Sequence, residues 1–155
     1  MKTIVYRLSI CMALLCAGAC HSTSRSGKSQ GDAASAENAI TGKYWRLIEL
    51  NGRPVTQASQ QNEPRLTFRE ENLQMDGNGG CNSFRGNYEL GEMGRIRFFG
   101  VVATQKACLH METEKELFKV FDMADNYALS ADGKILSLNR ARMAPLARFE
   151  AVYMQ

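Results

Sequence analysis

The stretch GNGGCNSFRGNY, residues 77–88, places four glycines and one cysteine ahead of a strand-like segment. Such a stretch can form a phosphate-binding loop, a metal-binding turn, or a tight turn held by a disulfide. A phosphate-binding loop needs a helix directly after its glycines, because the amino terminus of that helix faces the anion. Here the residues after Gly80 lead into 86–88, which reads as a strand, and no Lys-Ser or Lys-Thr pair follows. The phosphate interpretation is therefore excluded.

The beginning of the chain determines how Cys81 is interpreted. Lys2 and Arg7 precede an apolar run, and the small residues at 17–19 lead directly into Cys20. This is the layout of an export signal, and the apolar run is too short to cross a bilayer as a helix. A cysteine directly after the small residues resembles the lipobox of bacterial lipoproteins, in which it becomes the lipid-bearing first residue. We therefore expect 1–20 to be a lipoprotein signal peptide, with lipidation at Cys20 as the membrane anchor.

Residues 21–40 read as a flexible tether, because they are rich in Ser, Gly, Gln and Ala and have almost no large apolar side chains. The tether lacks the acidic cluster after Cys20 that marks surface export in lipoproteins of the Bacteroidetes type. We therefore expect a location in the cell envelope, lipid-anchored on the periplasmic face of the outer membrane. An unidentified envelope protein is then the expected partner.

Residues 41–155 have the length of one domain with a single core. Of the 19 basic side chains of the full chain two lie in the signal, so the mature chain carries 17 basic against 16 acidic side chains. Binding to nucleic acid depends on neutralising phosphates with a basic surface. A nearly neutral chain therefore predicts no nucleic-acid partner.

Cys81 and Cys108 are the two cysteines of this domain. With His110 they supply three ligands for a zinc ion, but no CxxC or HxxxH spacing supports a metal site. Thiols oxidise in the compartment of an exported protein, and closing a loop of 27 positions would stabilise the fold by roughly 3 kcal/mol. We expect a Cys81–Cys108 disulfide, ahead of a metal site or of two buried free thiols.

Short strand-like runs recur along the domain, separated by turn signals. Asn51-Gly52 and Asp132-Gly133 are strong turn pairs, and the second is the clearest hairpin signal of the chain. The residues at 91–94 form a further turn between two runs. The expected strands are 44–50, 65–68, 73–75, 87–90, 95–99, 127–130, 134–138 and 147–153.

One segment has helical spacing instead. The residues at 113–116, Thr-Glu-Lys-Glu, fit a capping box at a helix start. After them Leu117, Phe118, Phe121 and Ala124 recur on one face, which predicts an amphipathic helix of about three turns. The expected fold class is mostly β with one helix, α+β, in which a curled antiparallel sheet of about seven or eight strands wraps around that helix.

Catalytic chemistry has little support in the sequence. Cys108 and His110 stand two positions apart, an arrangement that brings a thiol and an imidazole into poor contact, and a disulfide would consume the thiol. No Gly-x-Ser-x-Gly element is present. We therefore expect no enzymatic activity, no catalytic residues, no cofactor and no metal.

Three sequence elements follow one another in a specific order: W-x-L-x-x-x-N-G at 45–52, G-C-N-x-x-x-G-x-Y at 80–88, and T-x-x-A-C at 104–108. Together they resemble the META domain of the HslJ family, over nearly all of 41–155. The resemblance implies a mostly antiparallel sheet wrapped around a helix, an exported or lipid-anchored envelope protein, and no known enzymatic activity. Members of the family have been linked to the heat-shock response, to novobiocin resistance and, in some pathogens, to motility or secretion.

Two functions follow from these expectations. The first is a non-enzymatic lipoprotein that acts through protein contacts in envelope stress or novobiocin-type antibiotic tolerance, with the exposed residues of the loop at 78–85 as the contact surface. The contact residues are Asn78, Asn82, Ser83 and Arg85. The alternative is a small binding module for a lipid or lipophilic drug, although a role as core is expected first for the residues that would line its cleft. The candidate lining residues are Trp45, Phe68, Phe98, Phe99, Phe121 and Met123.

Overall fold

The computed structural model describes residues 39–56, 63–109 and 111–153. The predicted signal peptide with Cys20, nearly all of the tether, and His110 lie outside the described residues. Ile40, which the composition assigned to the tether, is 2% exposed and packs in the core. Within the part of the chain that is described, no helix has the length and apolar character needed to cross a membrane.

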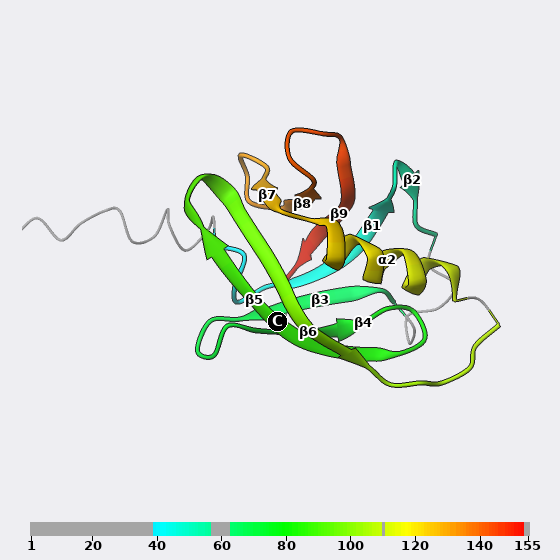
Figure 1. The fold of residues 1–155 in the computed structure, drawn as a ribbon. Helices are drawn as coiled ribbons and strands as arrows, with labels where there is room; N and C mark the ends of the chain where they lie inside the picture. Colours follow the sequence, from blue (N-terminus) through cyan, green and yellow to red (C-terminus); the bar gives the residue numbers. More distant parts are fainter. Residues whose placement is uncertain (1–38, 57–62, 110, 154–155) are drawn as a thin grey trace, which may run out of the picture.

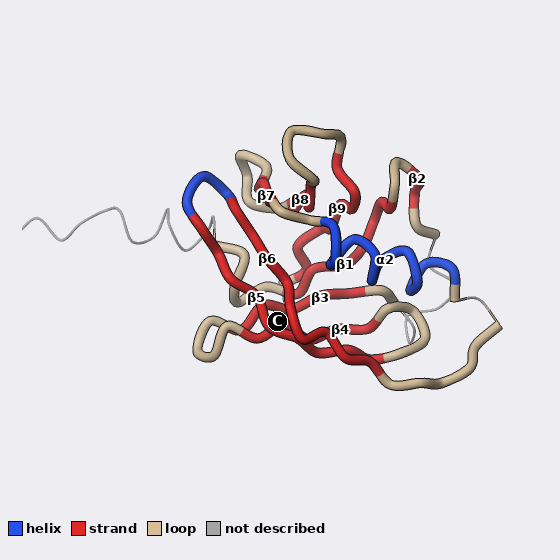
Figure 2. Tube along the Cα trace, in the orientation of Figure 1, coloured by secondary structure: helices blue, strands red, loops and turns tan. Residues whose placement is uncertain are grey.

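Strands are the predominant regular structure of the described chain, as Figure 2 shows. A single-turn 3-10 helix, η2 (Glu92–Gly94), joins two of them, and one α-helix, α2 (Glu112–Met123), lies between the sixth and seventh strands. The strands are β1 (Tyr44–Leu50), β2 (Arg53–Pro54), β3 (Arg65–Arg69), β4 (Gln74–Asn78), β5 (Ser83–Gly91), β6 (Arg95–Ala103), β7 (Asn126–Leu129), β8 (Ile135–Asn139) and β9 (Pro145–Val152).

The sheet closes on itself into a barrel, which corrects the expectation of a curled sheet wrapped around the helix. The strands pair antiparallel in the order β1-β3-β4-β5-β6-β7-β8-β9, and β9 pairs again with β1 to complete a barrel of eight strands. β1 makes this closure because it pairs with β3 near its start and with β9 along its length. The short β2 pairs with the end of β1. Closure satisfies the strand edges that an open sheet would expose.

The helix α2 packs against the inside of the barrel (Figure 1). Leu117, Val120 and Phe121 are buried, and the Phe121 ring lies 5.1 Å from Phe98 and 5.2 Å from Phe84, centroid to centroid. The apolar stripe predicted for this helix is therefore confirmed as core. A mostly β fold with one helix is likewise confirmed.

The predicted capping box is wrong. The helix begins one residue before Thr113, its N-cap is Met111, and no side chain caps it. Glu116 instead accepts a hydrogen bond from Lys119 at 2.7 Å on the surface. The carboxylate that matters at this helix end is that of Glu114, which turns inward.

Three strands are clearly longer than the sequence indicated, and β6 continues to Ala103 where an end at Phe99 was expected. β4 continues to Asn78 and β5 begins at Ser83, so only residues 79–82 form the turn between them. Gly77 lies within β4, and a Cβ atom there would stand 2.5 Å from the Phe84 ring. The sequence pattern suggested a turn at Gly77. The residue instead belongs to a strand, and its missing side chain leaves room for the Phe84 ring of the core.

Candidate functional site

The turn at 79–82 is bound to the start of α2 by the buried carboxylate of Glu114, which is 3% exposed. The Glu114 Oε2 atom accepts hydrogen bonds from the backbone N–H groups of Cys81 at 3.2 Å and Asn82 at 2.6 Å. Its Oε1 atom accepts one from the Asn82 side-chain amide at 2.8 Å. A buried carboxylate is costly unless it is hydrogen-bonded, and these three donors meet that need.

Asn82 connects the same turn to the loop after β6. Its Oδ1 atom accepts from the Lys106 N–H at 2.7 Å and from the Thr104 hydroxyl at 2.8 Å, while its Nδ2 also donates to the Lys106 carbonyl at 3.2 Å. The side chain is 1% exposed. Asn82 was predicted as an exposed contact residue, and that prediction is wrong because its amide is used inside the fold.

The Cys81–Cys108 disulfide is confirmed. It joins the turn to the loop that leads into α2, with a Cα–Cα distance of 6.1 Å and a sequence separation of 27. Both thiols are consumed by this bond, so neither sulfur remains as a zinc ligand or nucleophile. No group of three or more His, Cys, Asp or Glu side chains gathers at one point among the residues described.

Gly79 and Gly80 give the turn its shape. A Cβ at Gly79 would lie 2.6 Å from the Glu114 Cγ atom, so only glycine lets the helix approach this closely. Gly80 has φ +114°, which is unfavourable for residues with a side chain. Asn78 completes the turn through its side-chain oxygen, which accepts the Gly80 N–H at 2.7 Å. Asn78 therefore has a structural role in the turn, and its contact role stays a prediction.

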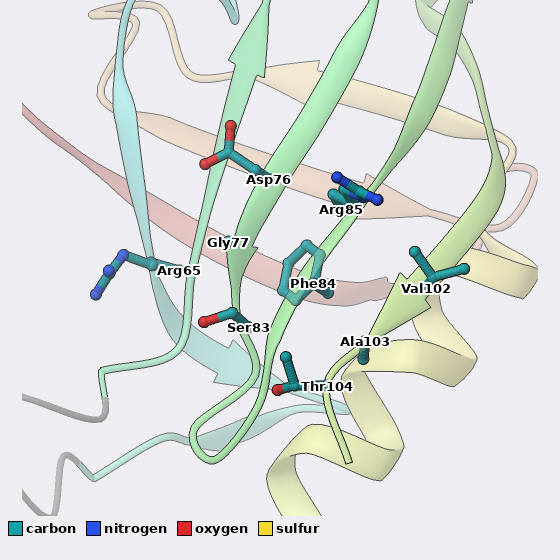
Figure 3. A pocket seen from close by; sticks show the side chains of 9 residues that line it. All are labelled: Arg65, Asp76, Gly77, Ser83, Phe84, Arg85, Val102, Ala103 and Thr104. Carbon is teal, nitrogen blue, oxygen red and sulfur yellow. The ribbon is translucent and has the colours of Figure 1, made fainter. Parts of the chain in front are cut away.

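A groove lies on the outer surface of the barrel beside this turn (Figure 3). Its volume is about 550 Å³. We call it the outer groove. It is lined by residues of β3 to β6 and of the loop after β6: Arg65, Asp76, Gly77, Ser83, Phe84, Arg85, Val102, Ala103 and Thr104.

The outer groove contains two of the predicted contact residues. Ser83 and Arg85 are two positions apart on β5, so both point outward, and both are exposed. Figure 3 shows Ser83 and Thr104 at one end of the groove and Asp76 with Arg85 at the other. Neither Ser83 nor Arg85 makes a side-chain hydrogen bond or ion pair with any other residue in the described ranges.

The remaining charged groups of the outer groove have partners. Asp76 is opposite Arg85 in the β4–β5 register, but its carboxylate accepts a hydrogen bond from the Arg69 Nε at 2.5 Å. The Arg65 guanidinium lies 5.6 Å from the centroid of the Tyr44 ring. Burial, followed by the hydrogen bond to Glu63, raises the pKa of Tyr44. The groove therefore holds two arginines, of which Arg65 contacts an aromatic ring and Arg85 has no partner among the described residues.

Sequence reasoning missed the other walls of this groove. Val102, 56% exposed, stands opposite Arg85 in the β5–β6 register, and Arg65 comes from a strand twenty positions before Arg85. Figure 3 places Arg65 and Val102 on opposite sides of the groove. Only strand pairing brings these positions together, and the sequence has no local signal for it.

The residues proposed to line an apolar ligand cleft pack mostly against one another. Trp45, Phe68 and Phe121 are at most 2% exposed, and Phe98 is 9% exposed, with its ring 6.3 Å from that of Phe68. Phe99 lies on the outside under the guanidinium of Arg97, at 5.1 Å, and is no part of the interior. Met123 is half-buried at the end of α2. This packing favours a role as core for the four buried side chains, Trp45, Phe68, Phe98 and Phe121.

Comparison with known proteins places the fold. The model of the META domain matches residues 38–153. The chain belongs to the META domain family. The resemblance drawn from the three sequence elements is thereby confirmed, and it includes the HslJ proteins, which are META-domain proteins.

Two solved structures are similar to this META domain, both determined by NMR. One, from Burkholderia xenovorans, has a TM-score of 0.61 and 19% sequence identity, and the match covers 77% of this chain and 88% of that one. The other has a TM-score of 0.56 and 23% identity, covering 72% of this chain and 90% of that one. At these identities the likeness concerns the fold. The search of curated proteins finds no match.

Proposed function

We propose that this META domain is the working part of a non-enzymatic envelope lipoprotein that is anchored through Cys20 and acts by contact with another envelope protein. The observation that carries the proposal is the outer groove, where Ser83 and Arg85 present unpartnered polar groups on a rigid barrel. Recognition surfaces commonly consist of such side chains held by a stable scaffold. The contact serves tolerance to envelope stress or to novobiocin-type antibiotics, which is the role that the family resemblance suggests.

The chemistry of the turn at 79–82 and of the residues bonded to it supports a role without catalysis. Glu114 and Asn82 direct their polar atoms at the turn and at the loop after β6, and the disulfide occupies both thiols. These groups position the turn that ends one side of the outer groove. Glu114, Asn82 and the disulfide therefore have a structural role, and the outer groove is the proposed recognition site.

The test uses a strain that lacks the protein, complemented with the full chain or with variants. Arg85→Glu reverses the charge in the outer groove, and Arg142→Glu makes the same change at an exposed arginine on the β8–β9 turn. We expect Arg85→Glu to lower survival under a novobiocin-type antibiotic or heat, and Arg142→Glu to behave as wild type. Equal survival of the two variants, at equal protein level, would refute the contact role of the groove.

Anchoring is tested separately with Cys20→Ser. We expect this variant to leave the membrane fraction and to lose the tolerance phenotype although the domain is folded. Membrane attachment that is unchanged in Cys20→Ser would contradict the lipoprotein assignment. Recovery of wild-type protein with the inner membrane would contradict the outer-membrane location.

A further inference from the structure

The polar side chains of the outer groove offer more free hydrogen-bond donors than free acceptors. The Arg85 guanidinium and the Ser83 hydroxyl offer N–H and O–H donors with no partner in the described part of the chain. The one carboxylate of the lining, Asp76, already accepts a hydrogen bond from Arg69. A ligand that supplies acceptors, and in particular an anion, would satisfy both free groups.

The charge of the groove limits the kind of anion. Arg85 and Arg65 contribute positive charge, but Arg65 already lies against the Tyr44 ring, and Asp76 stands directly opposite Arg85 across the β4–β5 pair. A dianion such as phosphate would meet repulsion from the Asp76 carboxylate, which Arg69 only partly neutralises at the surface. A carboxylate carries one charge and matches the planar fork of a guanidinium with two parallel hydrogen bonds.

The shape of the groove favours a side chain carried by an extended segment. The groove crosses four neighbouring strands, β3 to β6, which spans roughly 14 Å at about 4.8 Å per strand. Four residues of extended chain cover a similar length. Val102 and Ala103 supply an apolar wall on the β6 side, suited to the methylene groups of a glutamate.

We propose that the outer groove binds a carboxylate side chain of an extended acidic segment from the partner protein. The carboxylate pairs with Arg85 and accepts the hydroxyl hydrogen bond of Ser83, and its methylenes lie against Val102. The assignment of a protein segment as the source of the carboxylate rests on the proposed contact function.

The experiment titrates the full mature chain with two short peptides, followed by nuclear magnetic resonance of the backbone amides and of the arginine Nε–H groups. One is an acetylated, amidated pentapeptide with a central glutamate, and the other has glutamine at that place. We expect shifts at Gly77, Ser83 and Arg85 with the glutamate peptide, and at least tenfold weaker binding of the glutamine peptide. Equal binding of the two peptides, or shifts located elsewhere, overturns the proposal.

Variants test which side chain holds the carboxylate. Arg85→Gln is expected to weaken binding of the glutamate peptide about tenfold, because it removes a hydrogen bond to a charged group. Arg142→Gln is the control at an exposed arginine on the β8–β9 turn, away from the groove, and it should bind as wild type. Arg85→Lys keeps the charge but lacks the fork, so an intermediate affinity is expected. Unchanged affinity in Arg85→Gln overturns the proposal.

Two further titrations separate other sources of negative charge. Inorganic phosphate and vesicles containing phosphatidylglycerol replace the peptide under the same conditions. Tighter binding of either than of the glutamate peptide at the same groove residues would overturn the choice of a carboxylate. Weaker binding of both supports it.

The outcomes distinguish this inference from the proposed function. If the peptide fails to bind but Arg85→Glu still abolishes tolerance in cells, the carboxylate ligand is wrong and the contact function stands. If the peptide binds and the survival of Arg85→Glu equals that of Arg142→Glu, the ligand chemistry stands and the contact function in tolerance is wrong.

Discussion

The buried carboxylate of Glu114 can be tested by replacing it with an amide of the same shape. Glu114→Gln keeps the volume of the side chain but puts an NH₂ group where one carboxylate oxygen stood. Asn82 cannot rotate to offer its own oxygen, because that oxygen already accepts from Lys106 and Thr104. In either orientation, the NH₂ group of the glutamine therefore faces an N–H donor, either the Asn82 side-chain amide or the backbone N–H groups of the turn.

The magnitude follows from the three hydrogen bonds. The less costly orientation keeps an oxygen at the two backbone N–H groups of Cys81 and Asn82 and loses the bond from the Asn82 amide, which is 2.8 Å in the native chain. A lost hydrogen bond to a charged group costs about 1.5–3 kcal/mol, and the two remaining bonds weaken because their acceptor is neutral. Removing a buried charge offsets part of this loss. We expect a decrease of about 2–3 kcal/mol in the free energy of unfolding.

Urea unfolding of the oxidised protein, followed by Trp45 fluorescence, measures this change. Glu112→Gln is the control, because Glu112 is exposed in the same helical turn and should cost only about 0.5 kcal/mol through the helix dipole. If Glu114→Gln is no less stable than Glu112→Gln, the carboxylate does not hold the turn to the helix and the reasoning is refuted.

Other parts of the fold give independent predictions. Gly77→Ala should destabilise the fold by about 1–3 kcal/mol in urea unfolding, because its Cβ would stand 2.0 Å from the Arg65 carbonyl oxygen; a loss no larger than that of the exposed Gly91→Ala would contradict this. Replacing Cys81 and Cys108 together by alanine should cost about 3 kcal/mol in the same assay, and a thiol count of two on denatured, unreduced protein would disprove the bond. The hydrogen bond from the Ala141 N–H is the main cause that lowers the pKa of Asp125 below its ordinary 3.8. The stability that the ionised Asp125 contributes is therefore present above pH 3.8 and lost as the pH falls through the lower pKa of the folded state. Unfolding of Asp125→Asn and wild type should therefore differ more at pH 7 than at pH 2, and a constant difference would contradict this assignment.

Local patterns predicted the elements that depend on near neighbours. The alternation at 44–50 gave β1 with its observed limits, and Asp132-Gly133 gave the β7–β8 hairpin. The disulfide was also predictable, because the predicted export signal implies an oxidising compartment and the domain has two cysteines. The strand and hairpin predictions rest on backbone geometry, which is decided over a few residues. The disulfide prediction rests on redox chemistry and on the number of cysteines in the domain.

Glu114 was missed although the sequence held a signal for it. It precedes Leu117 by three positions and Phe121 by seven, so it lies on the apolar stripe of the helix. A carboxylate on a buried stripe needs hydrogen-bond donors. The glycine-rich turn, which the predicted disulfide places near the start of the helix, could supply them from its backbone N–H groups. The capping-box interpretation drew attention to Thr113 and Glu116, whose role at the surface is minor.

The sequence by itself determined the family, the strands with their turns, the single helix and the cysteine pair, because each depends on a short pattern with a local physical cause. The tertiary structure alone decided that β9 returns to β1 and closes the barrel, that Asn82 faces inward, and that Arg65, Arg85 and Val102 border one groove. Those facts depend on the register between strands and on core contacts such as those of Phe84 and Phe98 with Phe121 of α2. No local pattern carries that information, since pairing partners lie far apart in the chain.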